Sequence, residues 1–153
     1  MRLNAPPLVA MLNPAATEQS LASFERQTGL KIPPEVRQLY LIHDGEADAS
    51  DGIFGCIKML PLSEIEREIE LIGETGMIPI FRSGGGDLFY VKSFDPAIPD
   101  HYLREWWHEN PEEARVVALD INTYFSDFTK KLLRGQFVYR PDELEALIDR
   151  DEL

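Results

Sequence analysis

The first third of the chain contains two short amphipathic segments separated by residues that end and begin helices. After Thr17, a suitable N-cap, apolar side chains recur on one side of a segment that ends at Gly29. Pro33 and Pro34 stand where proline is best tolerated, in the first turn of a helix, and a second apolar stripe runs from there to His43-Asp44-Gly45. The pattern predicts two packed helices followed by a turn.

The middle of the chain consists of short apolar and β-branched runs bounded by turn residues, which is typical of strands. We expect strands over residues 53–59, 77–81, 88–91, 102–107 and 115–119. The glycine-rich stretch 83–87 predicts an antiparallel hairpin between the second and third of them. Ser63 and Glu66 form a capping-box pattern at the start of an amphipathic helix that stops at Gly73 or Gly76.

The last part of the chain predicts two further helices. One begins at Asp120 or Asn122 and ends at Gly135, and the other runs from about Pro141 to the C-terminus. Helices at both ends with strands between them predict an α+β fold, a central and mainly antiparallel sheet flanked by helices. We expect an extended N-terminal arm over residues 1–16, one domain over 17–134, and a C-terminal helical extension over 135–153 that packs on it.

Composition narrows the possible partners and the compartment. The 153 residues carry a formal net charge of −12, which disfavours direct binding to nucleic acid or to anionic membranes. The excess of acid either keeps the protein soluble or steers a basic protein partner. Cys56 is the only cysteine and is expected to be buried and inert. With neither a secretory leader nor a transmembrane segment in the sequence, we expect a cytoplasmic protein.

Several motifs in this order and spacing resemble a known family. They are Phe24-Glu25, the stretch 30–37 that reads Leu-Lys-Ile-Pro-Pro-Glu-Val-Arg, Leu41-Ile42-His43-Asp44-Gly45, Gly86-Asp87 before a strand, and the late helix over 124–133. Over residues 17–134 the chain resembles the SUKH superfamily, whose named founder is a fungal regulator of cell-wall assembly. The resemblance implies a helix-flanked sheet without enzymatic chemistry. Bacterial members are regarded as immunity proteins that bind and block a toxin, whereas the fungal branch acts as a regulatory interaction module.

The turn that ends the second helix opens a loop in which four acids fall within eight residues: Asp44, Glu46, Asp48 and Asp51. An EF-hand loop counted from Asp44 would need glycine at its sixth position and glutamate at its twelfth, where this chain has Ala49 and Gly55. Three interpretations remain: a solvated loop, a partner-facing patch, or an irregular cation site. We take the four acids as candidate partner contacts.

Asp87 and two adjacent tryptophans complete the candidate contacts. The loop before Asp87 lacks the Lys-Ser/Thr ending and the following helix of a phosphate-binding loop, so Asp87 either bonds loop amides or faces a partner. Trp106 and Trp107 point to opposite faces of a strand, so one of them is either covered by the rest of the chain or exposed as a binding hot spot.

No residue pattern predicts catalysis, a metal site or a cofactor. The three histidines are too far apart in sequence to define a metal site, and no nucleophile lies in a catalytic motif. Together with the resemblance to the SUKH superfamily, this implies a non-enzymatic protein-binding module, a bacterial immunity protein that neutralises a toxin by binding a domain of it. The alternative is a regulatory scaffold or ligand-sensing module without a toxin partner. The oligomeric state is left open.

Overall fold

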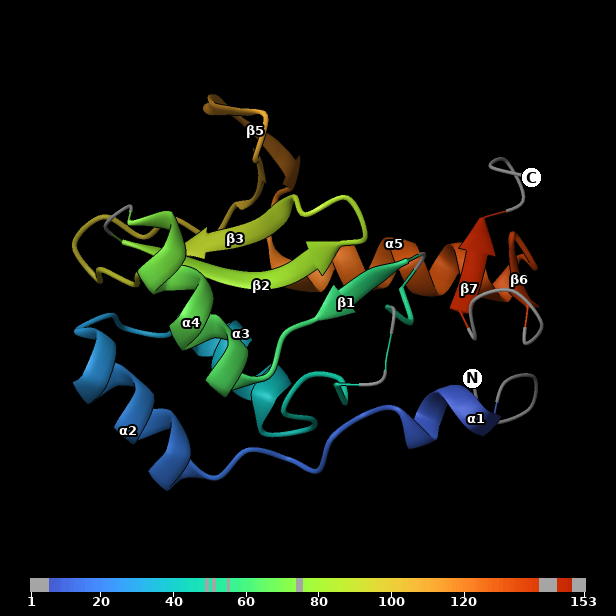
Figure 1. The fold of residues 1–153 in the computed structure, drawn as a ribbon, viewed down its shortest axis with the longest axis horizontal. Coiled ribbons are helices and arrows are strands. Elements are labelled where there is room, and N and C mark those ends of the chain that lie inside the picture. Colours follow the sequence, from blue (N-terminus) through green and yellow to red (C-terminus); the bar gives the residue numbers. More distant parts are fainter. Residues whose placement is uncertain are drawn as a thin grey trace.

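The computed structural model describes residues 6–48, 50, 52–54, 56–73, 76–140 and 146–149. The elements are α1 (Pro6–Ala10), α2 (Glu18–Thr28), α3 (Pro34–Tyr40), β1 (Ile57–Met59), α4 (Leu62–Ile72), β2 (Met77–Ser83), β3 (Leu88–Lys92), β4 (Leu103–Trp107), β5 (Asn110–Ala118), α5 (Ile121–Leu133), β6 (Phe137–Arg140) and β7 (Ala146–Asp149). Figure 1 shows α4 in front of strands β2 and β3 and α5 behind them.

Over the described residues, the main sheet has five antiparallel strands in the order β1-β2-β3-β4-β5. Each strand pairs with the next along the chain, so the sheet is a meander whose edges are β1 and β5. Representative partners are Ile78 with Val91, and Glu105 with both Phe89 and Arg115. The α+β fold with a mainly antiparallel sheet flanked by helices is confirmed.

The first two predicted helices are confirmed with their caps. The Thr17 hydroxyl accepts a hydrogen bond from the backbone N–H of Ser20, and the Ser20 hydroxyl accepts one from the N–H of Thr17, both at 3.0 Å. Gly29 ends α2 with φ of 72°, a conformation that favours glycine. Pro34 begins α3, where its missing N–H costs nothing.

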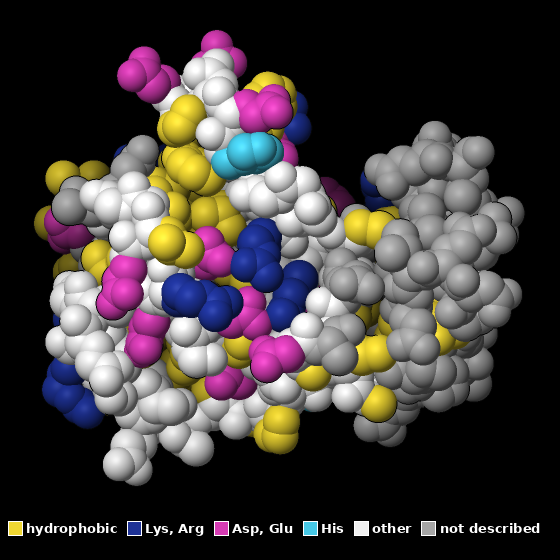
Figure 2. Space-filling model, viewed as in Figure 1, with side chains coloured by type: hydrophobic (Ala, Val, Ile, Leu, Met, Phe, Trp, Pro, Cys, Tyr) yellow, Lys and Arg dark blue, Asp and Glu magenta, His cyan; other side chains and the backbone are white. Residues whose placement is uncertain are grey.

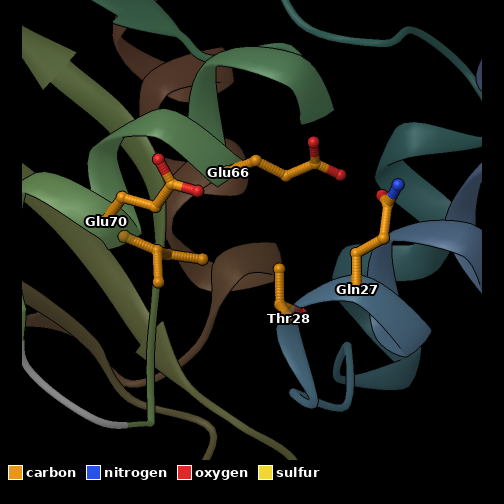
Figure 3. A pocket seen from close by; sticks show the side chains of 5 residues that line it. Gln27, Thr28, Glu66 and Glu70 are labelled. Carbon is orange, nitrogen blue, oxygen red and sulfur yellow. The ribbon is translucent and has the colours of Figure 1, made fainter.

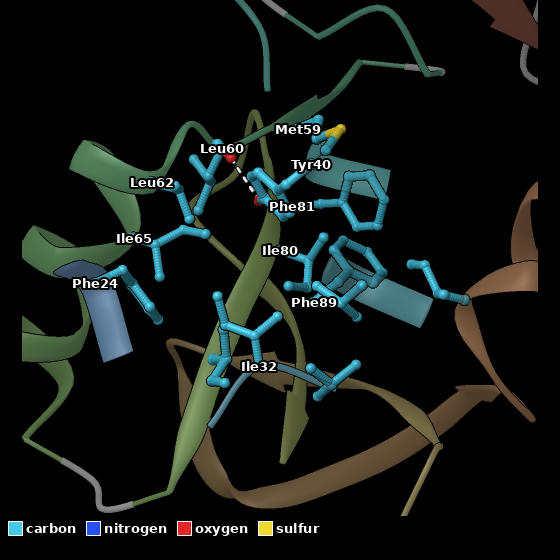
Figure 4. Packing of buried hydrophobic residues seen from close by; sticks show 14 of the residues in the cluster. Phe24, Ile32, Tyr40, Met59, Leu60, Leu62, Ile65, Ile80, Phe81 and Phe89 are labelled. Carbon is cyan, nitrogen blue, oxygen red and sulfur yellow. Dashed lines mark hydrogen bonds between the residues drawn. The ribbon is translucent and has the colours of Figure 1, made fainter. Parts of the chain in front are cut away.

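The core lies where α2, α3 and α4 meet the sheet. Phe24, Ile65 and Ile80 converge there with almost no exposed surface (Figure 4). The buried Tyr40 hydroxyl donates a hydrogen bond to the carbonyl of Leu60 at 2.7 Å, which satisfies the polar end of an otherwise apolar side chain. On the other side, α5 packs Tyr124 and Phe125 against Phe81 of β2, with ring centroids 5.3 and 5.9 Å from that of Phe81.

The two chain ends differ from expectation. Residues 6–10 form helix α1, not an extended arm, and its Leu8 is fully buried with Ile53 in a second apolar cluster. The prediction of a helix from Pro141 is wrong over residues 146–149, which pair with β6 as strand β7, while 141–145 lie outside the described residues. Phe137 and Tyr139 of β6 pack on the second cluster, so tertiary contacts favour a hairpin over the helical spacing of apolar residues.

Two strands also differ in length from their predictions. The predicted strand over 53–59 shrinks to Ile57–Met59, because Gly52 and Cys56 adopt positive φ values of 107° and 60° that interrupt an extended chain. Cys56 is half-buried, not buried. Strand β5 is longer than predicted, since it starts at Asn110 and passes through Pro111.

Candidate functional site

The first acid of the loop, Asp44, supports the start of helix α4. Its carboxylate accepts a hydrogen bond from the backbone N–H of Leu62 at 2.9 Å, in the first turn, where the N-cap residue Pro61 offers no side-chain acceptor. The expected capping box of Ser63 and Glu66 is therefore wrong. Gly45 follows with φ of 65°, and a Cβ atom there would come within 2.4 Å of the Pro61 nitrogen. The turn is pressed against the helix.

Glu46 is a buried structural carboxylate. One of its oxygens, Oε1, accepts the N–H of Met59 at 2.8 Å; the other, Oε2, accepts the N–H of Ile53 at 3.0 Å and the hydroxyl of Ser50 at 2.5 Å. Burial raises the pKa of Glu46 above its ordinary value. With 0% of its surface exposed, Glu46 has nothing to offer a partner, so the expectation that it forms a partner contact is corrected.

Asp48 is exposed and lines a shallow cleft with a volume of about 400 Å³. The lining residues are Asp48, Lys58, Ser63, Glu64, Arg67 and Arg82. Figure 2 shows Lys and Arg side chains gathered there among acidic ones.

The basic side chains of this cleft are paired with carboxylates within the protein. The buried Lys58 ammonium lies 2.8 Å from the Glu64 carboxylate, and the Arg82 guanidinium lies 2.7 Å from that of Glu68. These ion pairs therefore contribute first to the stability of the fold. Asp51 lies outside the described residues, and among the three described loop acids Asp48 is the exposed one.

Asp87 joins two loops of the sheet. Its carboxylate accepts the backbone N–H of His108 at 3.3 Å and lies 2.9 Å from the His108 ring nitrogen Nδ1, and its own N–H donates to the Ser83 hydroxyl at 3.1 Å. The hydrogen bond from the His108 side chain holds the pKa of Asp87 below its ordinary value. Asp87 therefore ties the β2–β3 loop to the β4–β5 turn, and it remains partly accessible.

The two tryptophans differ in exposure. Trp106 is partly buried against the main core, and among the described residues its buried indole N–H has no hydrogen-bond partner. Trp107 is 38% exposed, and the Arg115 guanidinium lies 5.2 Å from its ring centroid. Arg115 is held in turn by the Glu105 carboxylate. Trp107 is the one presented at the surface.

Strand β5 adds exposed apolar side chains that were not among the sequence candidates. Val116 is 54% exposed, Val117 39% and the following Leu119 64%. We call these three residues and Trp107 the ribbon surface, because the β4–β5 ribbon projects beyond the rest of the molecule (Figure 1). The sequence signal was the β-branched run 115–119, which predicts a strand but cannot say whether another element covers it.

A second cleft, of about 470 Å³, lies between α2 and α4. It is lined by Gln27, Thr28, Glu66, Ile69 and Glu70. Glu66 extends from α4 toward Gln27 across the cleft (Figure 3). The two carboxylates have the chemistry to bind a Lys or Arg side chain of a partner.

Within the described ranges, no group of three or more His, Cys, Asp and Glu residues is arranged to hold a metal ion. The helices of the described chain are all too short or too polar to cross a membrane.

In the described part of the chain, an antiparallel meander with helices on both faces defines a small α+β domain. The family model of the SMI1 / KNR4 family (SUKH-1) matches residues 15–127, so the chain belongs to this family, which is generally non-catalytic. The resemblance to the SUKH superfamily is thereby confirmed. A search of the curated proteins finds no match.

Proposed function

We propose that this protein is a bacterial immunity protein that binds a toxin domain and blocks it by occlusion in the cytoplasm of the producing cell. Membership of the SUKH-1 family carries the proposal, because bacterial members of the superfamily are regarded as immunity proteins. The net charge of −12 supports a basic partner, since charge complementarity raises association rates and selects among partners.

The ribbon surface supports binding to protein in particular. Exposed tryptophan is enriched among interface hot spots, and contiguous exposed apolar surface marks interaction sites in soluble domains. Trp107 is held in a defined orientation by Arg115, so less side-chain freedom is lost when it is covered. Among the acidic candidates from the sequence, Asp48 is exposed and Asp87 is partly accessible, so both can reach a partner.

A regulatory scaffold is the second candidate function. It is favoured by the description of the matching family, which takes its name from the regulator branch. The gene beside this one distinguishes the two: a large secreted toxin gene favours immunity, and an isolated gene favours the scaffold.

The test is to co-express this protein with the toxin domain encoded next to its gene and to measure cell survival. Protection and a stable purified complex are expected. Trp107→Ala should weaken the complex about 30-fold, as truncation of a hot spot does, and Leu71→Ala, which removes an equally apolar and 73% exposed side chain from α4, should leave it unchanged. The proposal is overturned if the wild-type protein gives no protection and forms no complex with the toxin domain.

A further inference from the structure

Along the outer edge of strand β5, main-chain groups have no partner among the described residues. β5 is the last strand of the sheet and pairs on one side with β4. On its other side, no hydrogen bond reaches the backbone of 110–118 from any described residue. The register with β4 shifts at two places, and where the pairing is regular the N–H and C=O groups that do not face β4 point away from it. Such an edge is a template for an added strand.

The two halves of this edge differ in chemistry. The half near the turn carries Pro111, Glu112 and Glu113, which are the residues that natural proteins use to keep an edge from pairing. The half near the body carries Val116 and Val117 in a β-branched run with no charge after Arg115. Val116 lies opposite Arg104 and Ala118 lies opposite Leu103, so Val117 is the extra residue of a β-bulge. Val116 and Val117 are both exposed, so the surface beside this half of the edge is apolar.

The charge around the edge is negative and uncompensated. Glu109, Glu112 and Glu113 are exposed, and none of them forms an ion pair with a described residue. Figure 2 shows acidic side chains at the projecting end of the ribbon, with hydrophobic ones below them. The nearby cation Arg115 is already engaged by Glu105 and Trp107. A segment lying along β5 meets apolar surface at one end and three free carboxylates at the other.

This charge argues against a second copy of the chain as the occupant. A second copy would bring its own Glu109, Glu112 and Glu113 to this edge. Like charges placed directly opposite destabilise a strand pair, and each copy also carries a net charge of −12. Lysine or arginine in the added strand would remove the same repulsion.

We propose that strand β5 binds its protein partner by strand addition, and that the added strand is an extended segment in which apolar residues alternate with Lys or Arg. The inference rests on the proposed function, because the segment belongs to the toxin domain. Main-chain hydrogen bonds along β5 supply affinity, and apolar side chains of the segment pack on Val116 and Val117. Its basic residues pair with the glutamates near the turn.

Hydrogen exchange of the full-length protein, alone and with the toxin domain encoded beside its gene, tests the inference. The amides of residues 114–118 that point away from β4 should exchange freely in the protein alone and at least tenfold more slowly in the complex. A complex that forms while these amides exchange as before would overturn strand addition and leave the immunity function standing. If no complex forms, the proposed function fails and the inference fails with it.

Two variants test the mode of binding and the charge. Val116→Lys places a charge on the edge and should weaken the complex at least tenfold, whereas Leu71→Lys, at a still more exposed site on α4, should not. Circular dichroism establishes that both variants fold. Glu112→Lys combined with Glu113→Lys should slow association and reduce its salt dependence. Unchanged association, or a dimer of the protein alone with protected β5 amides, would contradict a basic partner segment.

Discussion

Replacement of Glu46 by glutamine tests whether this acid serves the fold or a partner. Both carboxylate oxygens are acceptors, one for the N–H of Met59 and the other for the N–H of Ile53 and the hydroxyl of Ser50. Glutamine keeps one oxygen and replaces the other with an NH₂ group that cannot accept. At least one buried backbone N–H is then left without a partner, which costs about 1–3 kcal/mol.

A loss of about 2 kcal/mol is large against the roughly 5–15 kcal/mol that a domain of this kind has in total. With a urea m-value of about 2 kcal/mol per molar, the unfolding midpoint of Glu46→Gln should fall by about 1 M. Urea unfolding at pH 7, followed by tryptophan fluorescence, measures the shift. The matched control is Asp48→Asn, which removes a charge from the exposed part of the same loop and should change stability by less than about 0.5 kcal/mol.

The same variant has a pH signature. Burial raises the pKa of Glu46 above 4.5, so between that value and the raised one the folded protein binds more protons than the unfolded chain. The wild-type free energy of unfolding therefore decreases as the pH rises through this window, relative to the glutamine variant, which does not titrate there. The stability difference should be larger at pH 4.5 than at pH 7. Equal midpoints for wild type and Glu46→Gln at both pH values would refute the structural role and return Glu46 to the candidate contacts.

Three further perturbations have expected outcomes. Asp44→Ala removes the acceptor for the N–H of Leu62 and should lower the free energy of unfolding in urea by about 1 kcal/mol. An unchanged free energy would mean that this hydrogen bond does not stabilise the start of α4. Gly45→Ala places a Cβ against the backbone of Pro61, just before α4, at a residue whose φ is positive. This should lower the melting temperature by several degrees or more, and an unchanged melting temperature would contradict the close approach of Gly45 to Pro61. The hydrogen bond that the His101 ring donates to the Glu35 carboxylate raises the pKa of His101. This pair therefore stabilises the fold fully below about pH 6.5, and the contribution is lost as the pH rises through the raised pKa. His101→Gln should remove that pH dependence from the urea midpoint, and an unchanged pH profile would contradict the role of the pair.

The residues that begin and end helices and turns predicted much of the fold. Thr17, Gly29 and Pro34 act through their own backbone and the next few residues, so their effect on helix ends can be inferred without knowing what packs nearby. The same is true of the Gly-rich connection between β2 and β3, where the hairpin formed as predicted. The order of these signals also identified the superfamily.

The candidate contacts were predicted less well, because exposure depends on residues distant in sequence. Glu46 and Asp48 are two positions apart in one acidic run. Glu46 is nevertheless buried and accepts hydrogen bonds from the N–H groups of Ile53 and Met59, whereas Asp48 is exposed. The C-terminal residues 146–149 show the same limit, since strand pairing with 137–140 overrode a helical pattern. Neither outcome is determined by neighbours along the chain.

The amino-acid order settled helices α2 to α5, the hairpin, the α+β class and the family, since these follow from short-range backbone preferences and from the spacing of apolar residues. Tertiary structure decided the fold of both chain ends, which acids are structural, which tryptophan is exposed, and that no described residue pairs with the outer edge of β5. Those properties depend on what packs beside a residue, and α5 and α4 cover the middle of the sheet but leave the ribbon surface of Trp107 and Val116 in solvent.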